Sequence, residues 1–134
     1  MPILRQDYAL GRLWLALGLF GCGVLVYACL MPNPPQAQVQ HFDKFEHFAA
    51  FALLSGWFAN LLAPHYLRVI VTMVLFGAFI EVAQSFTPYR SADWHDLMAD
   101  AFGVVAGVTL ARFGAMRWLG YLDARVAAKT DQPR

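Results

Sequence analysis

Four stretches of apolar residues, separated by short polar segments, follow one another along the chain. The first runs from Leu13 to Met31 without a charged residue, and its 19 positions are enough for a helix to cross a hydrocarbon core about 30 Å thick. Three further stretches end at Ala63, before Arg90 and at Ala111. The pattern predicts helices over residues 10–31, 44–63, 67–87 and 94–113. We therefore expect an all-α, polytopic membrane bundle of four transmembrane helices.

The composition also indicates a membrane protein. Of the 134 residues, 59% are hydrophobic and only 14% are charged, whereas soluble domains carry about 25% charged residues. The length suits a single domain over residues 1–134. The formal net charge is only +1 and no basic block stands apart from apolar sequence, so we expect no nucleic-acid partner. A membrane lipid is the partner that this composition favours.

Lys and Arg residues are divided unevenly between the two ends of such a bundle. One end holds both termini and the loop after the second helix, and it carries eight basic residues against two at the other end. The eight are Arg5, Arg12, Arg68, Arg112, Arg117, Arg125, Lys129 and Arg134, and the two are Lys44 and Arg90. Because basic residues favour the cytoplasmic side, we expect both termini in the cytoplasm. We expect the tail, residues 114–134, to lie at the cytoplasmic interface and to be frayed from Ala127 onward.

This topology gathers most ionisable side chains at the extracytoplasmic face. Six of the nine acidic residues and three of the four histidines belong to this group. Its members are His41, Asp43, Lys44, Glu46, His47, Glu81, Arg90, Asp93, His95, Asp96 and Asp100. Ionised groups are costly in a bilayer, so their convergence indicates either a site or a paired network.

The fourth predicted helix carries one stripe of acidic and small residues. At 100° per residue, five positions fall within an arc of roughly 80°. They are Asp93, Asp96, Asp100, Gly103 and Gly107. Small residues let membrane helices approach closely, so we expect this stripe to face the bundle rather than lipid.

Plainer interpretations stand beside a functional one. Asp43 and Asp93 can cap helix starts, and Lys44 can be an interfacial surface charge. Glu81 and Asp100 lie within or beside apolar sequence, where an ionised group needs a partner. Arg90 is the nearest candidate, as a structural clamp between the third and fourth helices.

A metal site is a further alternative. His41-x-Asp43, His47 and Asp93-x-His95-Asp96 offer imidazole and carboxylate ligands, although no spacing matches a specific zinc motif. A nucleophile-elbow Gly-x-Ser-x-Gly and a phosphate-binding Walker loop are both absent from the sequence. A divalent cation is therefore the one cofactor kept as an alternative.

The ordered motifs of the polar group resemble those of the VanZ-like family of small bacterial membrane proteins. The resemblance covers about residues 41–111. It is carried by Asp43-Lys44-x-x-His47-Phe48, by Glu81-x-x-Gln84, and by Pro88-x-Arg90-x-x-Asp93-x-x-Asp96-x-x-x-Asp100-x-x-Gly103-x-x-x-Gly107. Many members carry Tyr where Phe51 stands and Asn where Asp100 stands.

The resemblance implies a multi-pass protein of the bacterial cytoplasmic membrane. The family takes its name from a member associated with resistance to the glycopeptide teicoplanin, and no settled biochemical activity comes with it. Together with the polar group, it suggests an effect on the cell envelope and on teicoplanin susceptibility.

Three functions follow as hypotheses. In the first, the outward cluster binds a lipid headgroup or a lipid-linked envelope precursor; its ligand-binding residues are Asp43, Lys44, His47, Glu81, Gln84, Arg90, Asp93 and Asp96. In the second, the protein is a metal-assisted hydrolase or transferase acting on a lipid phosphate or glycolipid; its catalytic candidates are His47, Glu81, Asp96 and Asp100. In the third, the cluster is a structural ion-pair network.

Overall fold

A computed structural model of the chain describes residues 4–5, 7–32, 42–115 and 117–130. This part of the chain is helical and contains no strand. Its helices are α1 (Gly11–Leu30), α2 (Phe42–Leu61), α3 (Tyr66–Ser85), α4 (Trp94–Arg112) and α5 (Arg117–Thr130). The all-α prediction is confirmed, and the first four helices lie within two residues of the predicted bounds.

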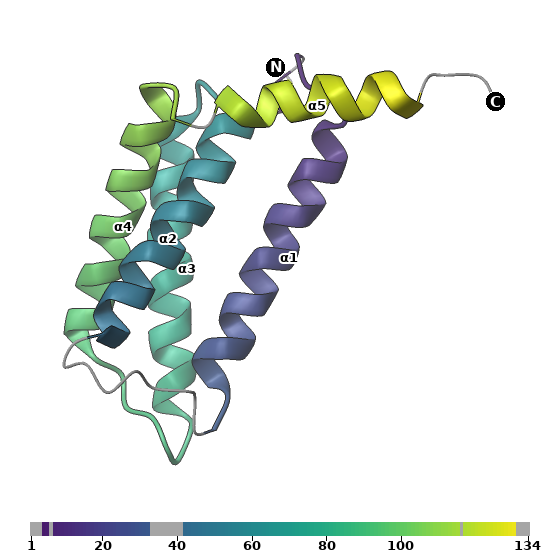
Figure 1. Cartoon of the computed structure of the whole chain (residues 1–134). Helices are drawn as coiled ribbons and strands as arrows, with labels where there is room; N and C mark the ends of the chain where they lie inside the picture. The colour runs from purple at the N-terminus through teal and green to yellow at the C-terminus, as the bar shows by residue number, and fades with distance from the viewer. Residues whose placement is uncertain (1–3, 6, 33–41, 116, 131–134) are drawn as a thin grey trace.

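The first four helices run alternately up and down, as short connections between them require (Figure 1). α2, α3 and α4 pack side by side, α1 is inclined to them, and α5 lies across the end at which α1 begins (Figure 1). At the opposite end lie the beginnings of α2 and α4 and the end of α3, which reaches further out than either (Figure 1). The arrangement therefore separates a basic end from an end that carries most of the acids.

The closest helix pair is α2 with α4, and the glycine stripe makes that approach feasible. A Cβ atom at Gly103 would lie 2.4 Å from the carbonyl oxygen of Phe48, and one at Gly107 would lie 2.1 Å from that of Ala52. Ser55 completes the contact by donating its hydroxyl to the carbonyl of Val104 at 3.2 Å. The prediction that the stripe faces the bundle is confirmed.

Apolar side chains fill the centre of the bundle and also cover its outside. Phe51, Ile80 and Val104 are completely buried. Large apolar side chains such as Phe20 and Phe102 are exposed on the outward faces of α1 and α4. An apolar exterior of this extent is typical of helices that face lipid rather than water.

Two helices, α1 and α3, are long and apolar enough to cross a membrane. α4 meets the same condition only together with α5, across a bend of 64°. α2 and α4 are less apolar because ionisable residues occupy their first turns. Length and composition thus give two candidate spans, or three with the bent pair, and the four-span topology stays a prediction.

The tail differs from the expectation. Residues predicted to be frayed from Ala127 onward are helical as far as Thr130, at the end of α5. Gly114, with a φ of 91°, forms the turn that leads from α4 toward this helix, a conformation that glycine adopts without steric cost. α5 is held because its buried residue Asp123 accepts hydrogen bonds from the start of α1, as described below.

Asp123, to which the sequence pattern assigned no role, caps α1 from a distance. Its carboxylate accepts the backbone N–H groups of Ala9 and Leu10 at 2.7 and 2.9 Å, and the indole N–H of Trp14 at 2.6 Å. Both backbone donors lie directly before Gly11, the first residue of α1, where a negative charge also interacts favourably with the helix dipole. Trp57 of α2 reinforces this junction by donating its indole N–H to the carbonyl of Trp14.

Candidate functional site

The start of α2, the end of α3 and the start of α4 bring the predicted polar residues to one end of the bundle (Figure 1). The convergence is confirmed for the residues that the structure describes, and His41 lies outside them. Within this end, two groups can be separated. One is a buried trio and the other is a network around Lys44.

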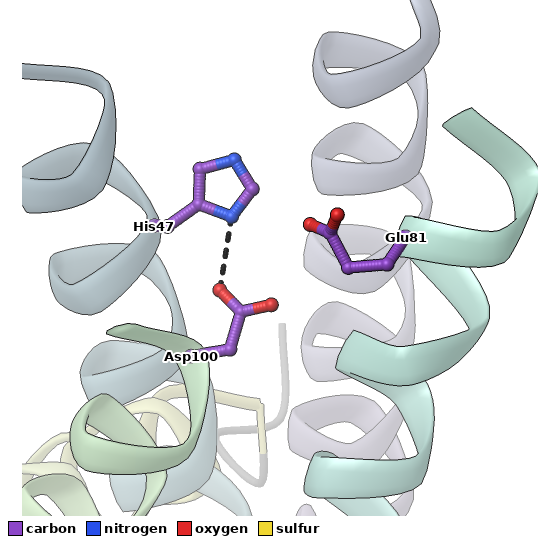
Figure 2. A group of neighbouring side chains, drawn as sticks. All are labelled: His47, Glu81 and Asp100. Atoms are coloured by element: carbon purple, nitrogen blue, oxygen red, sulfur yellow. Dashed lines mark hydrogen bonds and ion pairs between the residues drawn. The ribbon is translucent and has the colours of Figure 1, made fainter. Parts of the chain in front are cut away.

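The buried trio consists of His47, Glu81 and Asp100, from α2, α3 and α4 respectively. Their exposed fractions are 8%, 6% and 0%. His47 Nδ1 and Asp100 Oδ1 are 2.9 Å apart and form a buried hydrogen bond. Glu81 extends from α3 toward this pair, so the three polar groups point at a common space (Figure 2). One ligand atom from each residue lies within 4.8 Å of the other two.

Each carboxylate of the trio keeps one oxygen without a hydrogen bond. Glu81 Oε2 accepts the backbone N–H of Asp93 at 2.9 Å, but Glu81 Oε1 has no partner among the described residues. The same is true of Asp100 Oδ2. A buried carboxylate oxygen without a partner is destabilising. The trio therefore has unused capacity to accept a cation or a proton donor.

Gly77 of α3 makes room for the Asp100 carboxylate. A Cβ atom at this position would lie 2.9 Å from Asp100 Oδ2. Gly77 was not among the residues predicted for the site, although it precedes Glu81 by one helical turn and so shares its face. A glycine one helical turn before an acid in apolar sequence is the signal that could have indicated it.

The Lys44 network joins the starts of α2 and α4. Lys44 Nζ lies 2.9 Å from Asp93 Oδ2, 2.8 Å from Asp96 Oδ1 and 3.9 Å from Asp43 Oδ2. Lys44 is thus surrounded by carboxylates rather than available to an anion. Asp96, a predicted catalytic candidate, forms an ion pair with Lys44 and does not belong to the trio.

Asp93 caps α4, as one interpretation of the sequence predicted. Its carboxylate accepts the backbone N–H of His95 at 2.8 Å. The hydrogen bond from Lys44, and then those from His95, hold the pKa of Asp93 well below its usual range. The carboxylate is consequently ionised at neutral pH, as its role between Lys44 and the helix start requires.

Arg90 differs from Lys44 in having no carboxylate partner. It lies half-buried in the loop between α3 and α4, and it forms no ion pair or hydrogen bond with the residues described by the structure. The alternative of an Arg90 clamp onto Glu81 or Asp100 is not found in the described part of the chain, where Glu81 accepts the N–H of Asp93 and Asp100 bonds to His47.

Gln84 and Tyr89 attach this end of the bundle to α1. Gln84 Nε2 donates to the carbonyl of Cys29 at 3.1 Å, and the hydroxyl of Tyr89 donates to the carbonyl of Leu30 at 3.0 Å. Both acceptors lie in the last turn of α1, where carbonyl groups have no partner within the helix. Gln84, predicted as a ligand contact, therefore uses its amide N–H in helix packing.

Comparison with known proteins gives one result. The family model VanZ/LLP1 matches residues 13–116. Neither a curated protein nor a solved structure matches the chain. The matched range extends from α1 to the end of α4, and it includes both the trio and the Lys44 network. The chain belongs to the VanZ/LLP1 family.

Proposed function

We propose that this protein binds the phosphate-bearing headgroup of an envelope lipid at the outer face of the bacterial cytoplasmic membrane. In this proposal α1 to α4 all cross the bilayer, both termini lie in the cytoplasm, and the polar end faces outward. The distribution of basic residues supports that orientation, since seven of the nine Lys and Arg residues that the structure describes lie at the other end. The lipid-linked precursors of the cell wall are the class of ligand in view.

The observation that carries the proposal is the guanidinium of Arg90, which has no partner among the described residues. Only two basic residues, Lys44 and Arg90, belong to the polar end, and Lys44 is occupied by three carboxylates. A guanidinium can bind two oxygens of one phosphate with parallel hydrogen bonds, which a point charge such as an ammonium does less specifically. Arg90 is therefore the anion contact, and Lys44 serves to position the starts of α2 and α4.

The residues around Arg90 suit the headgroup level of a membrane. Phe86, Tyr89 and Trp94 flank it in the sequence, and all three are exposed. Aromatic side chains are enriched where apolar lipid meets water. A loop with this composition brings a guanidinium to the depth at which lipid phosphates lie.

The buried trio favours a second function at the same place, hydrolase or transferase chemistry on the lipid phosphate. The 2.9 Å contact with Asp100 holds the imidazole of His47 in one orientation, as a general acid or base requires. Under either function, sequestering or altering an envelope precursor would change susceptibility to glycopeptides such as teicoplanin.

A lipid-binding measurement on the full chain in detergent micelles tests the proposal. Native mass spectrometry with a short-chain phosphatidic acid would report the fraction of protein that retains the lipid. We expect Arg90→Gln to weaken retention at least about tenfold, since a charged hydrogen bond contributes about 1.5–3 kcal/mol, and Arg90→Lys to restore part of it. Arg117→Gln, an exposed arginine at the opposite end, is the matched control. Equal retention by the wild type and Arg90→Gln would refute the proposal.

Release of inorganic phosphate from the same lipid distinguishes the second function. Turnover by the wild type that is lost in His47→Gln, with lipid retention unchanged, would establish chemistry in addition to binding. Absence of release by the wild type would limit the function to binding.

A further inference from the structure

We infer that His47, Glu81 and Asp100 form a binding site for a single divalent transition-metal cation. The inference rests on the proposed function only for the anion, a lipid phosphate, that would reach the bound cation. The site itself stands on the geometry of the trio.

The first observation is convergence. Three helices contribute one ligand-type side chain each, and one ligand atom from each lies within 4.8 Å of the others. All three side chains are more than nine-tenths buried. Close backbone packing at Gly103 and Gly107 holds α2 against α4, and Gly77 lets α3 approach Asp100, so the positions of the ligands are set by the core of the bundle.

The second observation is the unsatisfied oxygens. Glu81 Oε1 and Asp100 Oδ2 are both buried, and both lack a hydrogen bond within the described part of the chain. Buried polar groups in folded proteins almost always have a partner, so two such atoms in one cluster require an explanation. A cation shared between them satisfies both at once.

The third observation is charge. No Lys or Arg pairs with Glu81 or Asp100 among the described residues, because Lys44 is bound by the outer carboxylates and Arg90 pairs with none. Uncompensated carboxylates at this depth are expensive. A divalent cation compensates them without adding another side chain to a tightly packed bundle.

The surroundings of the trio resemble the second layer of a metal site. Glu81 Oε2 is fixed by the backbone N–H of Asp93, and the Asp93 carboxylate is itself fixed by Lys44 and His95. Hydrogen bonds of this kind orient the carboxylates that hold a metal. The Lys44 network thus positions the α3–α4 connection over the trio.

The donor set indicates which cations fit. One imidazole and two carboxylates suit Zn²⁺, Mn²⁺ or Fe²⁺ better than soft, thiolate-seeking metals. Three protein ligands leave coordination positions open for water or a phosphate oxygen. A lipid phosphate bound by Arg90 is the anion that the proposed function would bring to those positions.

Titration of the metal-free full chain with Mn²⁺, followed by the electron paramagnetic resonance signal of free Mn²⁺, tests the inference. We expect saturation near one Mn²⁺ per chain and competition by Zn²⁺. Glu81→Gln, Asp100→Asn and His47→Gln should each weaken Mn²⁺ binding at least about tenfold. Glu46→Gln removes an exposed acid from the same end of α2 and should leave binding unchanged.

The wild-type titration decides the matter even where a variant fails to fold. Absence of stoichiometric Mn²⁺ and Zn²⁺ binding by the wild type would overturn the inference, as would a folded Glu81→Gln that binds with wild-type affinity. No lipid is present in the titration, and Arg90→Gln should bind Mn²⁺ as the wild type does. Failure of the metal site and failure of lipid binding are therefore separate results.

Discussion

Asp100 and Asp123 are both buried aspartates, yet their surroundings give them opposite roles. Asp123 accepts three N–H groups from the segment that begins α1. Asp100 has one polar contact, with His47, and one oxygen without a partner. A fully hydrogen-bonded carboxylate stabilises the fold, whereas one with spare acceptor capacity in a cluster is suited to hold a ligand. If the inferred metal site exists, the number of donors around each carboxylate separates the acid that stabilises the fold from the acid that holds the cation.

Replacing Asp123 by Ala should loosen the junction between α1 and α5. Three donors would lose their acceptor, and for the buried one, the indole N–H of Trp14, the unsatisfied group costs about 1–3 kcal/mol before relaxation. We expect a lower melting temperature and faster tryptic cleavage after Arg125, with α2 to α4 still folded. Asp7→Asn, which changes an exposed aspartate paired with Arg5, is the matched control. Unchanged cleavage and melting in Asp123→Ala would contradict this prediction.

At the scale of helices, the pairing of α2 with α4 decides where the site lies. The two helices touch through backbone at Gly103 and Gly107, which fixes both their rotation and their relative height. His47 and Asp100 then meet because each lies near the beginning of its own helix. His47 is adjacent to Phe48, Asp100 is one turn from Gly103, and Phe48 and Gly103 are in backbone contact. Glu81 joins them because Gly77 lets α3 approach Asp100. Small residues therefore set the geometry of the trio without belonging to it.

Adding one methyl group to this interface should be costly. In Gly107→Ala the new Cβ would meet the carbonyl oxygen of Ala52 at 2.1 Å, so α2 and α4 would have to separate. Overpacking of this kind costs about 1–3 kcal/mol. The measurement is the midpoint of unfolding in sodium dodecyl sulfate. Gly23→Ala in α1, where a Cβ would meet nothing within 4 Å, should unfold at or above the wild-type midpoint. If Gly107→Ala unfolded at the same midpoint as the wild type, α2 and α4 would be able to separate without loss of stability, and the prediction would be wrong.

The whole molecule is polarised, with basic residues at one end and the acid-rich site at the other. α5 lies across the basic end, and Asp123 connects it to the start of α1. The positive-inside rule applied to this arrangement predicts a cytoplasmic α5 and an extracytoplasmic α3–α4 loop. The same orientation would present Arg90 to the outer leaflet.

Thiol labelling of spheroplasts tests the orientation. In a chain whose Cys22 and Cys29 are replaced by Ala, Ser91→Cys should react with a membrane-impermeant maleimide in intact spheroplasts. Ala128→Cys should react only after permeabilisation. Both positions are exposed in the structure, so a difference in labelling reports the side of the membrane rather than burial. The reverse pattern would invert the topology and refute the outward-facing site.

The order of apolar and polar residues was sufficient to place four helices and the stripe that α4 turns toward its neighbours. Both depend on the period of a single helix, which is a local property of the backbone. It was also sufficient to bring the acids to one end, because alternating helices leave alternate connections on the same side. The tail was the exception. It is helical as far as Thr130, and within it Asp123 accepts hydrogen bonds from residues more than 100 positions away.

Which polar groups pair could not be deduced in this way. From the sequence, Lys44, Arg90 and Asp96 were all candidates for the site. In the tertiary structure Lys44 pairs with Asp96 and Asp93, and Arg90 has no partner among the described residues. Pairing depends on the rotation and height of one helix relative to another. Contacts between helices, such as those of Gly107 with Ala52 and of Gly77 with Asp100, set this rotation and height. The spacing of residues along a single helix carries no information about such contacts.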